Sequence, residues 1–140
     1  MTSITNFKVS RNVALNPVAR SIERQRLARW LATTTTELLM LDHGEECGSI
    51  VRASAEAIGC AIKSIEGFDD PEDVGGYLVD ALADLTRIAQ GGFRWDKAHG
   101  ARVSEALDMA VQILTASDAR TKLKAWAWAQ RITGQVLEAA

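Results

Sequence analysis

Apolar residues recur at three- and four-residue steps along most of the chain, which is the spacing of one face of an α-helix. The first such segment follows Asn16 and Pro17, a pair typical of an N-cap and the first position of a helix, and we expect it to end near Leu41. Threonines 33–36 are its weak point, because consecutive β-branched residues lower helix propensity. The flanking helical period still favours a helix, since no second strand is visible to pair with. Its predicted buried face contains Leu27, Trp30 or Leu31, Thr34, Leu38 and Leu41.

Four further segments show the same helical periodicity. The third helix has the clearest start signal in the chain, because Asp70 as N-cap and Pro71 in the first position are followed by acids that the helix dipole favours. Gly67 ends the second helix, two glycines at 91 and 92 end the third, and Ser117 or Asp118 caps the fifth. The predicted apolar faces are Cys47, Ile50, Val51, Ser54, Ile58, Ala61, Ile62 and Ile65; Val74, Leu78, Ala81, Leu82, Leu85, Ile88 and Ala89; and Val103, Leu107, Ala110, Val111 and Leu114.

This pattern predicts an all-α fold, a single-domain bundle of about five amphipathic helices over residues 17–140. Residues 1–16 carry no helix signal and are expected to form a flexible N-terminal arm. The length of 140 residues is typical of one domain, and the 47% apolar and 24% charged residues are those of an ordinary globular protein. No internal repeat or long linker divides the chain.

The sequence also predicts a cytoplasmic protein without cofactor, metal or membrane segment. No apolar run reaches the roughly 18 residues of a membrane helix, and the N-terminus lacks the order of a signal peptide. Cys47 and Cys60 lie on one predicted helix, about 20 Å apart at the helical rise, so we expect packing thiols and no disulfide. His43 has acids and Cys47 nearby, but such a local cluster makes a poor metal site, and a helix-capping turn is favoured.

Charge is segregated along the chain although the net charge is only −2. Residues 1–30 have a local charge of +5, residues 31–86 one of −10, and residues 87–140 one of +3. The basic first segment suggests nucleic-acid binding. Its arginines spread around the predicted helix, however, and the pI of about 5.7 is low for a dedicated nucleic-acid binder.

An acidic ladder lies on the third predicted helix. Asp73, Tyr77, Asp80 and Asp84 stand at i, i+4, i+7 and i+11, on the side away from the apolar face. One interpretation is simple solvation. The other is docking onto a basic groove of a partner, one that otherwise holds nucleic acid, by charge complementarity.

The loop at 91–100 combines two glycines with Phe93, Arg94, Trp95 and His99, a mixture common in recognition loops. The partner-contact interpretation applies to Phe93, Arg94 and Trp95. Alternatively, the two aromatic side chains fold back and plug the end of the bundle.

Within this loop, four residues separate Arg94 from His99. This spacing on an all-α bundle resembles the catalytic motif of HEPN-type ribonucleases, and the resemblance implies metal-independent RNA cleavage by this pair at a dimer cleft. It covers six residues, and Trp95 stands where the motif favours a polar residue.

Two tryptophans, Trp126 and Trp128, lie about 200° apart around the fifth predicted helix. One face is expected to carry Leu123, Trp126, Ala127 and Leu137, and the opposite apolar stripe Ala125, Trp128, Ala129, Ile132 and Val136. A helix that is apolar on most of its circumference is either central in its own bundle or buried by another chain. The second case makes Ala125, Trp128, Ile132 and Val136 a self-association surface, with a dimer as the commonest outcome.

The function favoured by the sequence is a non-enzymatic helical interaction protein of regulator or inhibitor type, acting as a homo-oligomer on a protein or ribonucleoprotein partner. Phage inhibitors that counter host defences offer an analogy at the level of the fold. The alternative is a nucleic-acid-binding module that uses the basic N-terminal segment, and the third candidate is the HEPN-like ribonuclease. The chain has no phosphate-binding glycine loop, GxSxG elbow or HExxH motif.

Overall fold

The computed structural model describes residues 17–66, 69, 72–117 and 119–138, which form five α-helices and one 3-10 turn. The all-α prediction is confirmed. The predicted arm, residues 1–16, and the predicted cap Asp118 lie outside the described residues. Within the described ranges, we find no helix with the length and apolarity that a membrane crossing needs. The elements are α1 (Pro17–Met40), α2 (Gly48–Ser64), α3 (Val74–Gln90), η1 (Lys97–His99), α4 (Gly100–Ala116) and α5 (Ala119–Glu138).

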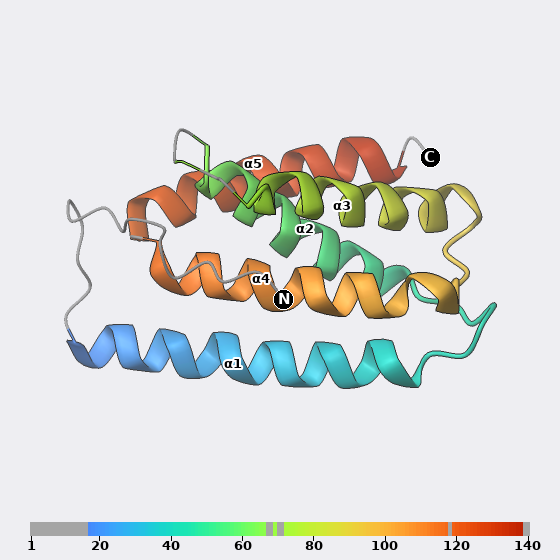
Figure 1. The fold of residues 1–140 in the computed structure, drawn as a ribbon, viewed down its shortest axis with the longest axis horizontal. Helices are drawn as coiled ribbons and strands as arrows, with labels where there is room; N and C mark the ends of the chain where they lie inside the picture. Colours follow the sequence, from blue (N-terminus) through green and yellow to red (C-terminus); the bar gives the residue numbers. More distant parts are fainter. Residues whose placement is uncertain (1–16, 67–68, 70–71, 118, 139–140) are drawn as a thin grey trace.

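Helix α2 lies at the centre of the bundle and contacts each of the other four α-helices. Figure 1 shows α1 running alongside α4 at one edge and α3 lying with α5 at the opposite edge. Helix α2 lies between these two pairs. Small side chains around the circumference of α2 let its four neighbouring helices approach closely. Its buried residues are Val51, Ser54, Ala55, Ala57, Ile58, Gly59, Cys60, Ala61 and Ser64.

The contact between α2 and α5 is the most extensive in the bundle and depends on small residues on both helices. Ala125, Ala129, Thr133 and Leu137 recur at four-residue steps along α5, and all four are buried. A Cβ atom on Gly59 would lie 3.4 Å from the Cβ of Ala129, so the two helices meet there in van der Waals contact. This stripe, rather than either predicted face of α5, points into the bundle.

The two tryptophans of α5 flank that buried stripe. Both are half-buried, and both pack against the cluster formed by Cys60, Leu114, Ala125 and Ala129. The Lys63 ammonium lies 5.4 Å from the Trp128 ring centroid, a cation–π contact within the chain. The same chain therefore covers much of Trp128.

Several predictions for α5 are wrong in detail. The helix at the centre of the bundle is α2, so the alternative that placed α5 there is wrong. Leu123 and Ala127, placed on an inner face, are exposed. Ala125 and Ala129 are at most 1% exposed inside their own chain, so they are not free to contact a second copy. Ile132 is half-buried, and the side chain of Val136 lies outside the described part of the structure.

Helix α1 follows its predicted pattern closely. Thr34, Leu38 and Leu41 are buried, and Trp30 and Leu31 pack partly against the core. The four-threonine run is helical throughout. Tertiary contacts of the flanking apolar residues outweigh the low intrinsic propensity of the run, as is usual for amphipathic helices.

Helix α3 begins at Val74, later than Asp70 and Pro71 predicted. Asp73 is its N-cap, and the Asp73 carboxylate accepts a hydrogen bond of 3.2 Å from the backbone N–H of Gly76. Asp73 has a positive φ of 53°, which aspartate tolerates better than most residues. Asp70 and Pro71 themselves lie outside the described residues.

The close α2–α5 contact generates the first prediction. Ala129→Leu should lower the free energy of unfolding by about 1–3 kcal/mol, because the added methylenes have no space against Gly59. Ala127→Leu, the same substitution on the exposed side of α5, should change it by less than about 0.5 kcal/mol. Urea denaturation followed by circular dichroism measures both, and equal effects would contradict the tight contact.

Candidate functional site

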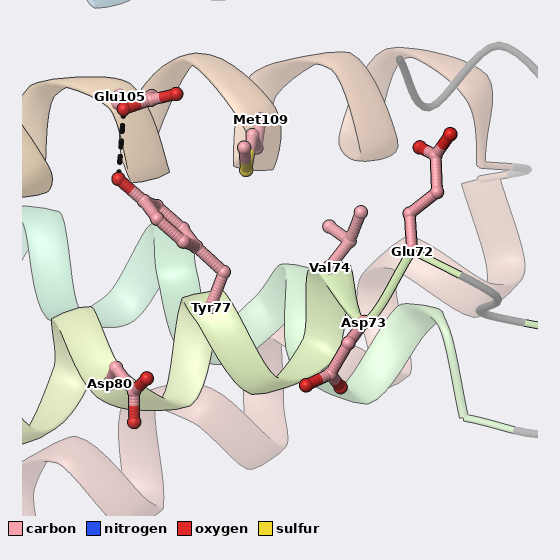
Figure 2. A pocket seen from close by; sticks show the side chains of 7 residues that line it. All are labelled: Glu72, Asp73, Val74, Tyr77, Asp80, Glu105 and Met109. Atoms are coloured by element: carbon pink, nitrogen blue, oxygen red, sulfur yellow. Dashed lines mark hydrogen bonds between the residues drawn. The ribbon is translucent and has the colours of Figure 1, made fainter. Parts of the chain in front are cut away.

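An open cleft of about 620 Å³ lies between α3 and α4 and is strongly acidic. Four of its seven lining side chains are carboxylates, and no lysine, arginine or histidine lines it. Figure 2 shows Tyr77 rising from α3 toward α4, with Met109 beside it and Glu72 toward the start of α3. The lining residues are Glu72, Asp73, Val74, Tyr77, Asp80, Glu105 and Met109.

Tyr77 is fixed across the cleft by a hydrogen bond. Its hydroxyl donates to Oε2 of Glu105 on α4 at 2.9 Å (Figure 2). Partial burial, followed by this hydrogen bond and the Glu105 charge, raises the pKa of Tyr77. The phenol therefore stays protonated near neutral pH, keeps donating to Glu105 and holds its ring at the cleft surface.

The cleft contains three members of the predicted ladder, Asp73, Tyr77 and Asp80. Glu72 and Glu105 were missed. Glu72 does not share the helical spacing of Asp73, Tyr77 and Asp80, and Glu105 comes from a helix whose packing against α3 no local pattern specifies. Sequence periodicity identified one wall of the cleft, and the fold supplies the other.

Asp84 does not belong to this exposed face, and its prediction as a ladder residue is wrong. Its side chain is only 1% exposed. Position 84 lies three residues after Ala81 and four before Ile88, both buried, so the helical repeat carries it to the inner side of α3.

Three cationic or basic side chains surround the buried Asp84 carboxylate. Its Oδ1 accepts a hydrogen bond of 3.3 Å from Nη1 of Arg87 and lies 3.5 Å from Nδ1 of His99. Its Oδ2 accepts a hydrogen bond of 3.1 Å from Nη1 of Arg102. Charge pairing of this kind is what a buried carboxylate requires. We call Asp84, Arg87, His99 and Arg102 the Asp84 cluster.

Arg94 and His99, the predicted ribonuclease pair, have different partners. Arg94 is exposed and its backbone forms an isolated β-bridge with Glu46. His99 lies between Asp84 and Asp96, with its Nε2 at 3.3 Å from Oδ2 of Asp96. No side-chain contact of the described residues joins Arg94 to His99, so the geometry gives no support to their acting as a pair.

The loop between α3 and α4 closes one end of the bundle. Trp95 is 1% exposed, so its prediction as a partner contact is wrong and the plug interpretation holds for it. Phe93 is half-buried, with the Arg52 guanidinium 5.3 Å from its ring centroid. Arg94 is the member of this predicted set whose side chain faces solvent.

Backbone hydrogen bonds tie this loop to the loop between α1 and α2. The N–H of Gly44 donates to the carbonyl of Trp95 at 2.8 Å, and the N–H of Trp95 donates to the carbonyl of Glu45 at 2.8 Å. The N–H of Cys47 donates to the carbonyl of Phe93 at 3.0 Å. Together with the buried Trp95 side chain, these bonds join the two loops at one end of the bundle.

Both cysteines are buried and free, as expected for packing thiols. Burial is the main cause that raises the pKa of Cys47 and of Cys60 to about 11 each. Neutral thiols are poor nucleophiles and poor metal ligands. Among the residues described, we find no group of three or more His, Cys, Asp or Glu side chains arranged to hold a metal ion.

Comparisons with known proteins give no relative: no family model, curated protein or solved structure matches the chain. The acidic cleft and the Asp84 cluster are therefore interpreted from their own geometry.

The second prediction concerns the buried charge. Replacing both Arg87 and Arg102 with Gln leaves a buried carboxylate without its cationic partners and should destabilise the protein by about 1–3 kcal/mol. The double variant Arg26→Gln plus Arg29→Gln, which removes the same charge from exposed positions on α1, should cost less than about 1 kcal/mol. Thermal or urea unfolding measures the difference, and equal losses would contradict the role of the pairing.

The third prediction follows from the two thiols. At about pH 8 iodoacetamide should label neither cysteine in the folded protein and both in urea, as read by mass spectrometry. Their pKa values are about 11 in the folded protein against an ordinary value of 9.0, so unfolding releases protons between these two pH values. The thiol contribution to stability is thus complete below about pH 9 and is lost as the pH rises toward about 11. Rapid native labelling would contradict the burial.

Proposed function

We propose that this protein is a non-enzymatic interaction protein of the cytoplasm, of regulator or inhibitor type, that binds a basic segment of a protein or ribonucleoprotein partner. The observation that carries the proposal is the α3–α4 cleft, where four carboxylates surround one fixed tyrosine.

The charge of the cleft favours cationic ligands. Glu72, Asp73, Asp80 and Glu105 lie around one opening with no basic lining residue to offset them. Complementary charge accelerates encounter and selects against acidic partners. A lysine or arginine of the partner meets carboxylates on both sides of the cleft, one set from the α3 side and Glu105 from α4.

Tyr77 and Met109 add an apolar component to the same opening. The Tyr77 ring is held by its hydrogen bond to Glu105 and offers a face to a guanidinium or ammonium group. Met109, 3% exposed, contributes a polarisable floor. An aromatic ring among carboxylates suits arginine in particular, because the guanidinium group both stacks and forms bidentate hydrogen bonds.

A basic segment of this kind is common on proteins that bind nucleic acid. When the acidic cleft binds such a segment, it blocks the partner's nucleic-acid-binding surface. This is the mode of action we propose for the inhibitor function, by analogy with acidic inhibitors on unrelated folds. If the protein acts as a dimer, the contact uses a surface other than Ala125 and Ala129, which their own chain covers.

The fourth prediction tests the cleft directly. Asp80→Lys should weaken binding of a nine-arginine peptide at least about fivefold, while the fold remains intact because Asp80 is exposed. Glu37→Lys on α1, an exposed acid outside the cleft, makes the same change in net charge and should weaken binding less than about twofold. Fluorescence anisotropy at low salt measures both affinities.

Equal weakening by the two variants would mean that the peptide senses only net charge, and the cleft would then have no binding role. A pull-down from the native host with wild type and Asp80→Lys identifies the natural partner as the protein whose capture the substitution abolishes. Sedimentation of the same samples gives the oligomeric state.

A further inference from the structure

The Asp84 cluster places two arginines on one buried carboxyl group, outside the acidic cleft. Arg87 comes from the last turn of α3 and Arg102 from the first turn of α4. Their Nη1 atoms bond to different oxygens of Asp84, at 3.3 Å and 3.1 Å. The Asp84 side chain thus holds two guanidinium groups, one on each of its carboxylate oxygens.

Each arginine keeps most of its hydrogen-bonding capacity. A guanidinium has five N–H donors, and the contacts with Asp84 engage one nitrogen of each arginine. The Arg87 side chain is 69% exposed and that of Arg102 is 50% exposed, so both side chains remain largely accessible to solvent. Two guanidinium groups that share one carboxylate at the surface are suited to bidentate binding of a tetrahedral oxyanion.

The buried position of Asp84 explains why the arginines are preorganised. An aspartate 1% exposed on the core side of α3 costs free energy that an apolar residue would not. What it provides is orientation: the arginines lose part of their conformational freedom before any ligand arrives, which lowers the entropic cost of binding. His99, 3.5 Å from Oδ1 of Asp84, further restricts the carboxylate.

The acids near the two arginines are engaged with other groups. Asp96 is turned toward η1, where Oδ1 accepts a hydrogen bond of 3.1 Å from the N–H of Ala98 and Oδ2 faces His99. Glu105, one turn beyond Arg102, is held by Tyr77. The exposed side of the cluster is therefore made by Arg87 and Arg102.

We propose that Arg87 and Arg102 form a binding site for a phosphate dianion, either inorganic phosphate or the terminal phosphate of a small phosphomonoester, with Asp84 as the positioning residue. The site neighbours the acidic cleft, because Arg102 stands three residues before Glu105 on α4, and it has the opposite ligand preference.

The test is a titration of the whole protein with inorganic phosphate, adenosine monophosphate and adenosine, at constant ionic strength maintained with chloride. NMR of the arginine side-chain N–H groups should show saturable shifts at Arg87 and Arg102, with a Kd on the order of 1 mM for a phosphate-bearing probe. Equal affinity for phosphate and the nucleotide indicates the free ion as the natural ligand, and tighter binding of the nucleotide indicates a phosphomonoester. Adenosine should leave both signals unchanged.

Arg102→Gln and Arg87→Gln should each weaken phosphate binding about tenfold, since each removes charge-assisted hydrogen bonds. Arg131→Gln, an exposed arginine on α5, is the matched control and should change the affinity less than about twofold. Any of four results would overturn the proposal. The first two are NMR shifts spread over all arginines and an equal loss of phosphate affinity in Arg131→Gln. The other two are binding of adenosine equal to that of the nucleotide and no saturation by about 20 mM phosphate. If a variant is unfolded by circular dichroism, the wild-type shift map alone decides.

Discussion

The bundle depends on the close approach of α2 to its neighbours. A helix that contacts four others must present a short side chain wherever another helix axis passes near, and α2 does so with glycine, alanine, serine and cysteine. The contact of Gly59 with Ala129 illustrates this requirement, because a Cβ atom on Gly59 would lie 3.4 Å from the Ala129 Cβ. Because α2 is filled in this way, larger side chains such as Leu78, Leu107 and Leu137 pack from the outer helices toward it.

The seam between α3 and α4 is the part of the molecule with the most polar chemistry, and the central packing makes it possible. With α2 supplying the core contacts of both helices, their outer edges are free to carry charged groups. Tyr77 with Glu105 and Asp84 with Arg102 link the same two helices at different levels. The first link lies in the acidic cleft, and the second joins a buried carboxylate to two surface arginines, so acidic and basic side chains follow one another along the seam.

Helical periodicity was sufficient to predict the fold class, the order of the helices and most of the core. In α1 to α4, each predicted inner apolar position is buried or packed against the core. The prediction was incomplete for α2, where it left out small buried residues such as Gly59 and Cys60, and it failed for α5, because periodicity marks large apolar residues and the α2–α5 contact is made by small ones. It also misplaced Asp84, since a charged residue was assumed to face water although its spacing from Ala81 and Ile88 put it on the inner side. Pairs such as Asp84 with Arg102 arise only from tertiary packing, which no local pattern encodes.

The joined loops at the end of the bundle have a consequence for how this surface can change. Their three cross-connections are made by main-chain atoms of Gly44, Glu45, Cys47, Phe93 and Trp95. Main-chain bonds persist whatever side chain is attached, so the exposed Arg94 side chain is not needed for them. The carboxylates of Glu45 and Glu46 do contribute, because they accept hydrogen bonds from the N–H groups of Asp42 at 3.3 Å and Gly48 at 2.8 Å. The surface there can acquire new charges or aromatic groups by single substitutions while its backbone stays in place. A loop that is held by its main chain can change an exposed side chain, such as that at position 94, without loss of the fold.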